Sequence, residues 1–311
     1  MSVLICGSFA YDNIMVFPDK FKNHIIPEKV HILNVSFMVP SMRREFGGCA
    51  GNIAYNLNML DGQAAVPMGT VGKDFEPYAD WMGKNNICQD YVRVIDDAFT
   101  AQAFITTDLD DNQITAFHPG AMEYAHHNKV YQAKDISMGI ISPDGREGMM
   151  QHALQFNEAD IPFVFDPWQG MPMFDGEELK DFIHQASWVT VNDYEWQLMQ
   201  ERTGYGAKDI AEQVKALIVT LGGKGSIIYA DGNEYEIPTA KPDQISDPTG
   251  CGDAYRAGLL YGLLHDMDWE TTGRIASLMG MIKIQSNGTQ NHSFTLDEFK
   301  LLFKENFNRE I

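Results

Sequence analysis

Short apolar runs alternate with longer segments of helical periodicity through the second half of the chain, and this alternation limits the fold more than any other feature. The apolar runs lie at 137–141, 162–165, 188–191 and 217–221. Strands that are joined by helices run parallel, and a parallel sheet needs helices on both of its faces. We therefore predict an α/β fold in which a mostly parallel sheet lies between two layers of helices. The chain then closes with a hairpin and three helices, near 226–237, 253–265, 270–285 and 296–306.

Two regions do not follow this alternation and indicate a smaller β structure. Extended runs at 14–17 and 35–39 are interrupted by prolines, which are typical of short edge strands. Runs at 100–106 and 114–117 flank a polar turn, which is the pattern of a β-hairpin. We predict one domain over 1–311 with a small β-rich lid formed by about 14–46 and 98–119.

Polar residues follow several of the predicted strands. Ser8 and Asp12 come after a first strand near 3–6, and Asp166, Asn192 and Thr220 come after later ones. In parallel sheets, ligands bind outside the carboxyl ends of the strands. We expect these residues to line one shared site.

The segment 246–258 has the richest chemistry. Gly250 and Gly252 allow a tight backbone turn, and Asp253 starts an amphipathic helix. Such a turn directs free N–H groups at an anion, and a carboxylate beside it can accept a proton from an attacking hydroxyl. An aspartate at a helix start is equally common as a cap, and the spacing alone does not separate the two interpretations. The motif of P-loop enzymes is absent from the sequence, and the glycines at 222–225 are a weak signal.

Charge and cysteine content exclude several classes of partner. The net charge of −20 argues against nucleic acid and anionic membranes, which require a basic face. The four cysteines are widely spaced and form no C-x-x-C pair, which favours reduced thiols. The first apolar run is too short to cross a membrane. We expect a cytoplasmic protein.

Four motifs in a fixed order resemble those of the ribokinase-like (PfkB) family of sugar and nucleoside kinases. They are 47–52 (GGCAGN), 192–195 (NDYE), 220–222 (TLG) and 247–253 (DPTGCGD), the last similar to the family signature D-T-x-G-A-G-D. The resemblance implies a ribokinase-like fold and a phosphotransferase that uses ATP with Mg²⁺.

The same resemblance implies roles for individual residues. Asp253 would be the catalytic base, and the γ-phosphate would be held by the N–H groups of Gly250, Cys251 and Gly252. Mg²⁺ would be organised through water by Asn192 and Glu195, and K⁺ would be bound near Asp247, Thr249 and the loop 287–291. ATP would contact Asn192, Thr220, Gly222 and Gly225.

For the acceptor, the stretches 37–54, 106–122 and 166–169 are similar to those of bacterial adenosine kinases, including dimeric ones. This implies phosphorylation of the adenosine 5′-hydroxyl to give AMP, as in purine salvage, and a homodimer formed through the lid. The acceptor would be bound by Ser8, Asp12, Gly48, Asn52, Phe117 and Gln169, with Phe37 as a second wall of the purine slot.

Several positions depart from the family pattern. Pro248 and Cys251 replace the usual Thr and Ala, and the thiol pKa of Cys251 is expected to fall at a helix N-terminus. Gly170 replaces a second Gln, and Ala103 replaces a stacking aromatic unless Phe104 substitutes for it. A ribokinase or another sugar or nucleoside kinase remains an alternative, as does a catalytically inactive nucleotide sensor.

Overall fold

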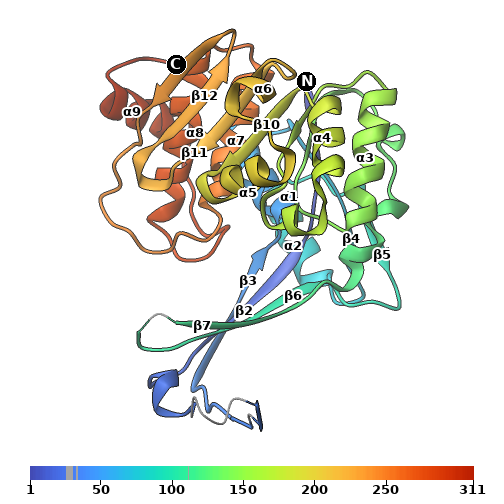
Figure 1. Ribbon diagram of the computed structural model, residues 1–311. Helices are drawn as coiled ribbons and strands as arrows, with labels where there is room; N and C mark the ends of the chain where they lie inside the picture. The colour runs from blue at the N-terminus through green and yellow to red at the C-terminus, as the bar shows by residue number, and fades with distance from the viewer. Residues whose placement is uncertain (26–30, 33, 111) are drawn as a thin grey trace.

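The computed structural model describes residues 1–25, 31–32, 34–110 and 112–311. The remaining positions, which belong to the predicted lid and its hairpin turn, lie outside the described residues. Figure 1 shows a large α/β body from which a narrow β-sheet projects. The predicted α/β/α architecture with a β-rich lid is confirmed.

The body is built on a large sheet. Within the described residues it has nine strands in the order β13-β12-β11-β10-β9-β8-β1-β4-β5. All neighbours pair in parallel except β11–β12 and β12–β13, which are antiparallel. In chain order the strands are β1 (Ser2–Cys6), β4 (Ala65–Gly72), β5 (Tyr91–Ile95), β8 (Ile136–Ile141), β9 (Phe163–Phe165), β10 (Trp188–Asn192), β11 (Ala216–Thr220), β12 (Ser226–Ala230) and β13 (Asn233–Ile237).

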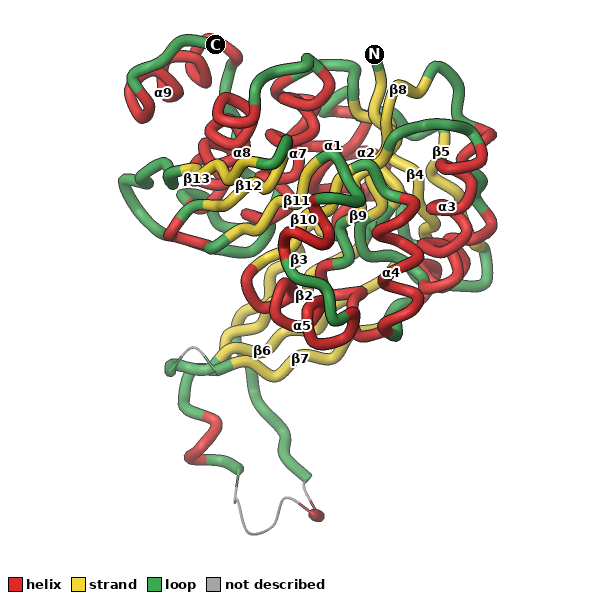
Figure 2. The backbone as a smooth tube through the Cα atoms, turned by 45° about the horizontal axis from the view of Figure 1, so that its top comes forward, coloured by secondary structure: helices red, strands yellow, loops and turns green. Residues whose placement is uncertain are grey.

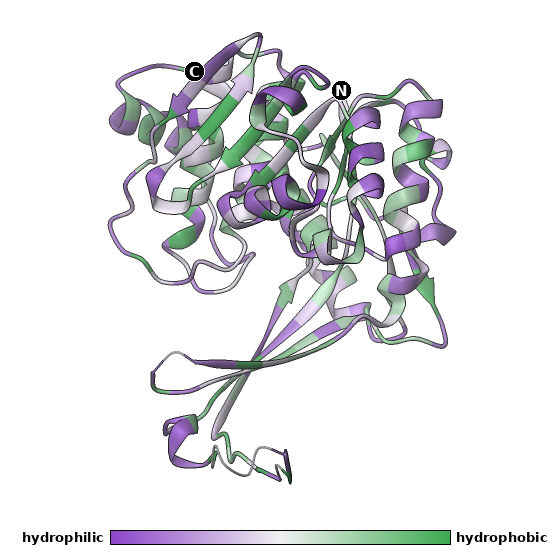
Figure 3. Cartoon of the chain, viewed as in Figure 1, coloured by the Kyte–Doolittle hydropathy of each residue, from purple (hydrophilic) through white to green (hydrophobic). Residues whose placement is uncertain are grey.

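Alternate side chains of these strands pack against two helical layers. Val3 and Ile5 point into one core together with residues of α1, α2, α7 and α8, whereas Leu4 and Cys6 point into the other, with residues of α3, α4 and α5. The helices are α1 (Cys49–Leu60), α2 (Glu76–Lys84), α3 (Arg146–Glu158), α4 (Gly176–Gln185), α5 (Asp193–Thr203), α6 (Ala207–Ala211), α7 (Cys251–Leu264), α8 (Trp269–Ile284) and α9 (Leu296–Phe307). Figure 3 shows the hydrophobic strands between helices with hydrophilic outer surfaces. Among the described helices, none has both the length and the apolar character needed to cross a membrane.

The lid is a separate four-stranded sheet in the order β3-β2-β6-β7. Figure 2 shows its strands leaving the body side by side. The strands are β2 (Ala10–Val16), β3 (Ser41–Gly47), β6 (Ala101–Thr107) and β7 (Gln113–His118). Short 3₁₀ helices lie between these elements: η1 (Phe21–Asn23), η3 (Gly120–His127), η4 (Val130–Gln132), η5 (Trp168–Met173) and η6 (Gly222–Lys224).

Differences from the sequence prediction concern the N-terminal half, where β4, α2 and β5 were not predicted. The run 35–39 forms no strand, and the second lid strand is β3, directly before the glycines of 47–48. The run 35–39 is extended, but within it Phe37 packs against Phe17 and Phe21 toward the outer end of the lid. Strand β4 was not predicted because Pro67 and Gly69 interrupt its apolar pattern.

Candidate active site

The turn at 247–253 leads into α7, and its backbone has the form that binds an anion. Gly250 is the N-cap of α7 and has φ 79°, a left-handed conformation that favours glycine. A Cβ on Gly250 would also lie 3.1 Å from the side chain of Thr289. The first N–H groups of a helix have no intrahelical acceptor and form the positive end of its dipole. This helix end therefore presents the donors that a phosphoryl group requires.

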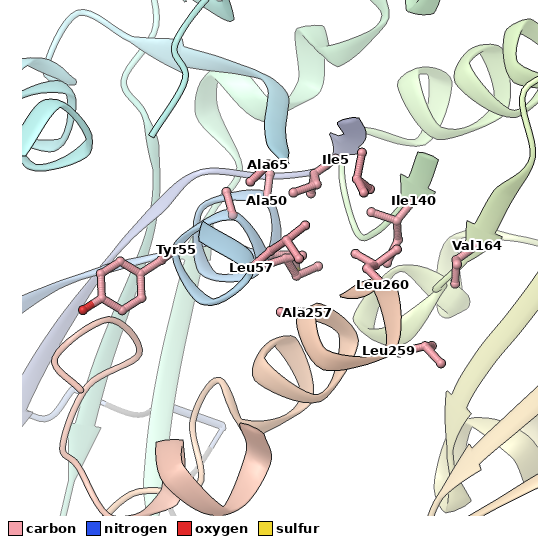
Figure 4. Packing of buried hydrophobic residues seen from close by; sticks show 14 of the residues in the cluster. Ile5, Ala50, Tyr55, Leu57, Ala65, Ile140, Val164, Ala257, Leu259 and Leu260 are labelled. Atoms are coloured by element: carbon pink, nitrogen blue, oxygen red, sulfur yellow. The ribbon is translucent and has the colours of Figure 1, made fainter. Parts of the chain in front are cut away.

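Asp253 lies in the first turn of α7 and is only 2% exposed. Its Oδ2 accepts a hydrogen bond from Asn52 Nδ2 at 2.8 Å. Asn52 is on α1, and Figure 4 shows α1 and α7 side by side over the sheet, with Leu57 and Leu260 among the packed residues. Burial raises the pKa of Asp253 to about 7, although the Asn52 hydrogen bond opposes this rise. A carboxylate with this pKa is well suited to act as a base near neutral pH.

An ion pair that the sequence analysis missed lies one helical turn further along α7. Arg256 donates from Nε and Nη2 to Asp166 Oδ1 at 3.1 and 2.9 Å, and both side chains are almost fully buried. Ser142 Oγ donates to the other oxygen of Asp166 at 3.1 Å. The Arg256 charge also lowers the pKa of Asp253 and of Glu195, against the larger effect of burial. One buried guanidinium therefore favours the ionised form of three buried carboxyl groups, those of Asp166, Asp253 and Glu195.

Asn52 is held by a second missed residue, Gln290. Gln290 Nε2 donates to Asn52 Oδ1 at 2.9 Å and to the Tyr78 hydroxyl at 2.6 Å. Gln290 Oε1 accepts from Trp81 Nε1 at 3.0 Å. Because these bonds fix the amide of Asn52, its Nδ2 points at the carboxylate of Asp253.

Four lid residues form a row across the four strands. Asp12 on β2 is paired with Glu45 on β3 and with Ala103 on β6, and Ala103 is paired with Phe117 on β7. Paired residues of neighbouring strands place their side chains on the same face. Burial raises the pKa of Asp12 to about 6, and the charges of Glu45 and Asp247 add to the rise. Since Asp247 opens the turn at 247–253, this face of the lid adjoins that turn.

Phe104 occupies the opposite face of the lid sheet, because it neighbours Ala103 in the same strand. It therefore does not replace the aromatic side chain that is absent at Ala103. The purine-slot prediction for Phe37 is also not supported, because that ring packs against Phe17 and Phe21. Phe117 is 52% exposed and Gln169 is exposed. Within the described chain, no side-chain hydrogen bond or aromatic pair joins Phe117 or Gln169 to Asp253 or Asn52.

Ser8 and Gly48 position the start of α1. Ser8 Oγ accepts from the N–H of Cys49 at 3.2 Å, and its carbonyl accepts from the N–H of Ala50 at 3.0 Å. Gly48 has φ 85°, and a Cβ there would lie 2.5 Å from the Ser8 carbonyl oxygen. Both residues thus fix the helix that carries Asn52.

The predicted nucleotide residues lie at the carboxyl ends of β10 and β11. Asn192 is paired with Thr220 across these strands. Gly222 and Gly225 follow with φ 56° and 94°, and a Cβ on Gly225 would collide with the carbonyl oxygen of Ile237. These glycines let the turn between β11 and β12 pass close to the sheet edge.

Asn192 and Glu195 cap each other at the start of α5. Glu195 Oε1 accepts from Asn192 Nδ2 at 2.7 Å, and Oε2 accepts from the N–H of Asn192 at 2.8 Å. Each oxygen keeps a free lone pair for a water molecule. Among the described residues, no group of three His, Cys, Asp or Glu side chains could bind a metal directly. The free lone pairs of the Glu195 carboxylate fit Mg²⁺ held through water, which is how this ion is commonly bound beside phosphates.

Cys251 does not behave as the sequence suggested. Burial raises the pKa of its thiol to about 11; the charge of Lys283 opposes this rise, and the charges of Asp247 and Asp253 add to it. The prediction of a lowered pKa is wrong. Its N–H also donates to the Pro248 carbonyl at 3.2 Å, so in this structure one of the three predicted phosphate donors has a partner within the turn.

The fold and this set of groups define a class of kinases. The chain matches the pfkB family of carbohydrate kinases over residues 13–295. It belongs to this family, and it is an enzyme that transfers a phosphoryl group to a hydroxyl acceptor.

Individual relatives refine the comparison. A nucleoside kinase of Methanocaldococcus jannaschii is 31% identical over 278 residues, which cover 87% of this chain and 89% of that protein. The structure of Burkholderia thailandensis nucleoside kinase in complex with inosine is 50% identical, with a TM-score of 0.91 and 99% of both chains covered. Another structure of that enzyme, in complex with ADP-inosine, is 51% identical with a TM-score of 0.88, and covers 99% of this chain and 97% of that chain. Thermotoga maritima ribokinase, 19% identical with a TM-score of 0.79 and covering 98% and 99% of the two chains, shares the fold.

Proposed function

We propose that the protein is a nucleoside kinase that transfers the γ-phosphoryl group of ATP to the 5′-hydroxyl of purine nucleosides, with adenosine as an acceptor. The observation that carries this proposal is the row of Asp12, Ala103 and Phe117 on one face of the lid. It combines a carboxylate for ribose hydroxyls with an apolar and aromatic surface for a base. A free sugar would require polar partners on all sides.

The row also suggests how selective the enzyme is toward the base. Ala103 leaves space beside Phe117, and Gly170 contributes no side chain where a second glutamine was expected. Because few side chains can form hydrogen bonds with the purine edge, the enzyme discriminates weakly between adenine and hypoxanthine. The relative from Burkholderia thailandensis binds inosine, which supports this broader acceptor range.

In the proposed reaction the ribose lies between the lid and α1. The Asp12 carboxylate accepts hydrogen bonds from the ribose 2′- and 3′-hydroxyls, and the Asn52 amide donates to them. The 5′-hydroxyl lies beside Asp253. Asp253 takes the hydroxyl proton while the 5′-oxygen forms a bond to the γ-phosphorus and the bond from that phosphorus to ADP breaks. The N–H groups of Gly250 and Gly252 stabilise the charge on the transferring group. The products are ADP and the nucleoside monophosphate, and the proton leaves Asp253 for solvent.

Glu195 and Asn192 hold the waters of a magnesium ion in this proposal. The ion, when bound, neutralises charge on the β- and γ-phosphate oxygens. Glu195 is 4% exposed, and burial raises its pKa to about 7. A nearby divalent cation would favour the ionised carboxylate, so metal binding and ionisation of Glu195 support each other.

The lid of about 14–46 and 98–119 closes over the acceptor and excludes water in this proposal. Its other face carries exposed apolar side chains: Met42, Phe104 and Ile114. This face needs a cover, and a homodimer formed through the lids supplies one. The purine-binding face and the dimer face are then opposite sides of one sheet.

ADP release with a panel of adenosine, inosine, ribose and fructose tests the proposal. Adenosine and inosine should be turned over with a kcat/KM at least about tenfold higher than either sugar. Asp253→Asn should lose about 10²–10⁴ of the rate while it still binds ATP. Ribose turnover above that of both nucleosides would favour a ribokinase instead. ATP binding without ADP release for any acceptor would favour a nucleotide sensor.

A further inference from the structure

The amino group of Lys283 is buried in the last turn of α8, and the proposed reaction does not use it. The residue has an exposed fraction of 0%. Its Nζ donates to the carbonyl oxygen of Asp247 at 2.7 Å and to that of Ser286 at 3.1 Å. Burial of an ammonium is strongly unfavourable unless partners compensate for the lost water. A methionine or leucine would fill the same space at lower cost, so the charge itself needs an explanation.

These two carbonyl groups lie in the region that the sequence resemblance assigned to potassium. Asp247 opens the phosphate-binding turn, and Ser286 comes directly before the loop 287–291. Backbone carbonyl oxygens are also the ligands that replace the water shell of K⁺ in proteins. An ammonium carries the same single charge and offers three N–H donors to such oxygens. With Lys283 bound to them, these residues do not fit a potassium ion at this position.

We propose that the Lys283 ammonium takes the place of a monovalent cation and holds the phosphate-binding turn in its active form. It ties the end of α8 to the first residue of the turn. The carboxylate of Asp247 is then free to accept from the N–H of Thr249 at 2.9 Å and from the N–H of Gly288 at 3.0 Å. Both bonds fix the backbone that leads to Gly250.

Other charged groups near this position are arranged around the same carboxylate. Arg43 Nη2 lies 3.8 Å from Asp247 Oδ2, and Arg43 Nε lies 3.6 Å from Glu45 Oε1. Arg43 is 45% exposed, so water screens it, whereas Lys283 is not screened. Lys283 is therefore the cation that acts on the turn from its buried side. It is a positioning residue, because it reaches the reacting atoms only through the backbone.

A simpler interpretation is that Lys283 only stabilises the C-terminal end of α8, where cations are favourable. The two interpretations differ in their response to ions in solution. If the ammonium replaces a bound cation, its removal should create a site that K⁺ or NH₄⁺ fills. If it is only a helix cap, its removal should weaken the fold equally in every salt.

The experiment compares the full-length protein in potassium, ammonium and tetramethylammonium chloride at equal ionic strength. For the unmodified protein, kcat for ADP release should agree within about twofold among the salts, and the melting temperature should not change. Lys283→Ala should lose about tenfold to a hundredfold of kcat in tetramethylammonium. K⁺ or NH₄⁺ should restore part of this loss and raise the melting temperature of the variant by about 2–4 °C.

Two variants serve as controls. Arg274→Ala removes a positive charge from the same helix, where Arg274 pairs with the exposed Glu270, and should respond to no particular cation. Lys283→Met removes the charge but still fills the space, so K⁺ should not rescue it.

Activation of the unmodified protein by K⁺ of about fivefold or more over tetramethylammonium would overturn the proposal. So would a folded Lys283→Ala variant whose kcat and melting temperature are the same in all three salts. If Lys283→Ala does not fold, activation of the unmodified protein by K⁺ would still overturn the proposal. The melting temperatures are measured without substrates, so they remain valid if the acceptor assignment fails.

Discussion

Arg256→Met should be one of the most damaging single substitutions in the body, because Arg256 compensates for buried carboxylates on three different elements. The guanidinium and the Asp166 carboxylate are 4% and 1% exposed, and two hydrogen bonds join them. Loss of one member of a buried pair costs about 3–5 kcal/mol. The cost of protonating the carboxyl group sets an upper limit of similar size on this loss of stability. The stranded carboxyl can instead take up a proton, which at pH 7 costs about 4 kcal/mol for a group of pKa about 3.9.

The assay is urea unfolding together with the pH dependence of kcat/KM. Arg256→Met should lower the free energy of unfolding by about 3–5 kcal/mol at neutral pH. Arg274→Ala, which breaks a partly exposed pair on α8, should lower it by at most about 1 kcal/mol. Arg256 lowers the pKa of Asp253, so its removal should move the acidic limb of the kcat/KM profile to higher pH.

A double variant makes the test specific. Asp166→Asn removes the charge that Arg256 neutralises, so Asp166→Asn/Arg256→Met should be more stable than the sum of the single effects predicts. A cost below about 1 kcal/mol for Arg256→Met, with an unchanged pH profile, would refute the reasoning.

Two further outcomes are expected. Asp144 is buried, its Oδ2 has no hydrogen-bond partner among the described residues, and burial raises its pKa to about 8. The folded protein binds this proton more tightly than the unfolded chain does. Asp144 therefore lowers the free energy of unfolding increasingly as pH rises toward 8. Asp144→Asn should therefore gain stability over the unmodified protein between about pH 5 and pH 8, and parallel melting curves at all pH values would contradict this. Phe104→Glu places a charge on the outer lid face and should convert the proposed dimer to a monomer in light scattering, whereas Leu154→Glu, at a leucine on α3 that is also exposed, should not.

Much of the body could be predicted because its signals are local. Apolar runs and the polar residues after them were sufficient to place Asp166 and Asn192 at the sheet edge, as the structure has them. Strand β3 could not be found in this way, because its run Arg43, Arg44 and Glu45 is polar and half-exposed in a lid that has little core. Its strand character comes from pairing with β2, which the sequence does not display.

The candidate site was predicted unevenly for the same reason. Asp253 and Asn52 belong to glycine-rich motifs that can be recognised in a single sequence. Arg256 and Lys283 look like ordinary helical residues, and only burial separates them from solvent-exposed ones. The error at Cys251 also came from burial, which raises the pKa of its thiol and which the position at a helix start does not reveal.

The way in which the lid joins the body has a consequence for how this chain can vary. Ala10 pairs with Gly47 at the base of the lid, and Asp12 is only two residues from that anchor. The described residues 17–25 and 34–40 lie away from the body, so a change in chain length there would leave the position of Asp12 unaltered. Divergence in that outer stretch can therefore change the contacts that the lid makes without disturbing the end at which we propose that ribose binds. Strict constraint on sequence and length should be confined to the ends of β2 and β3 that join the body.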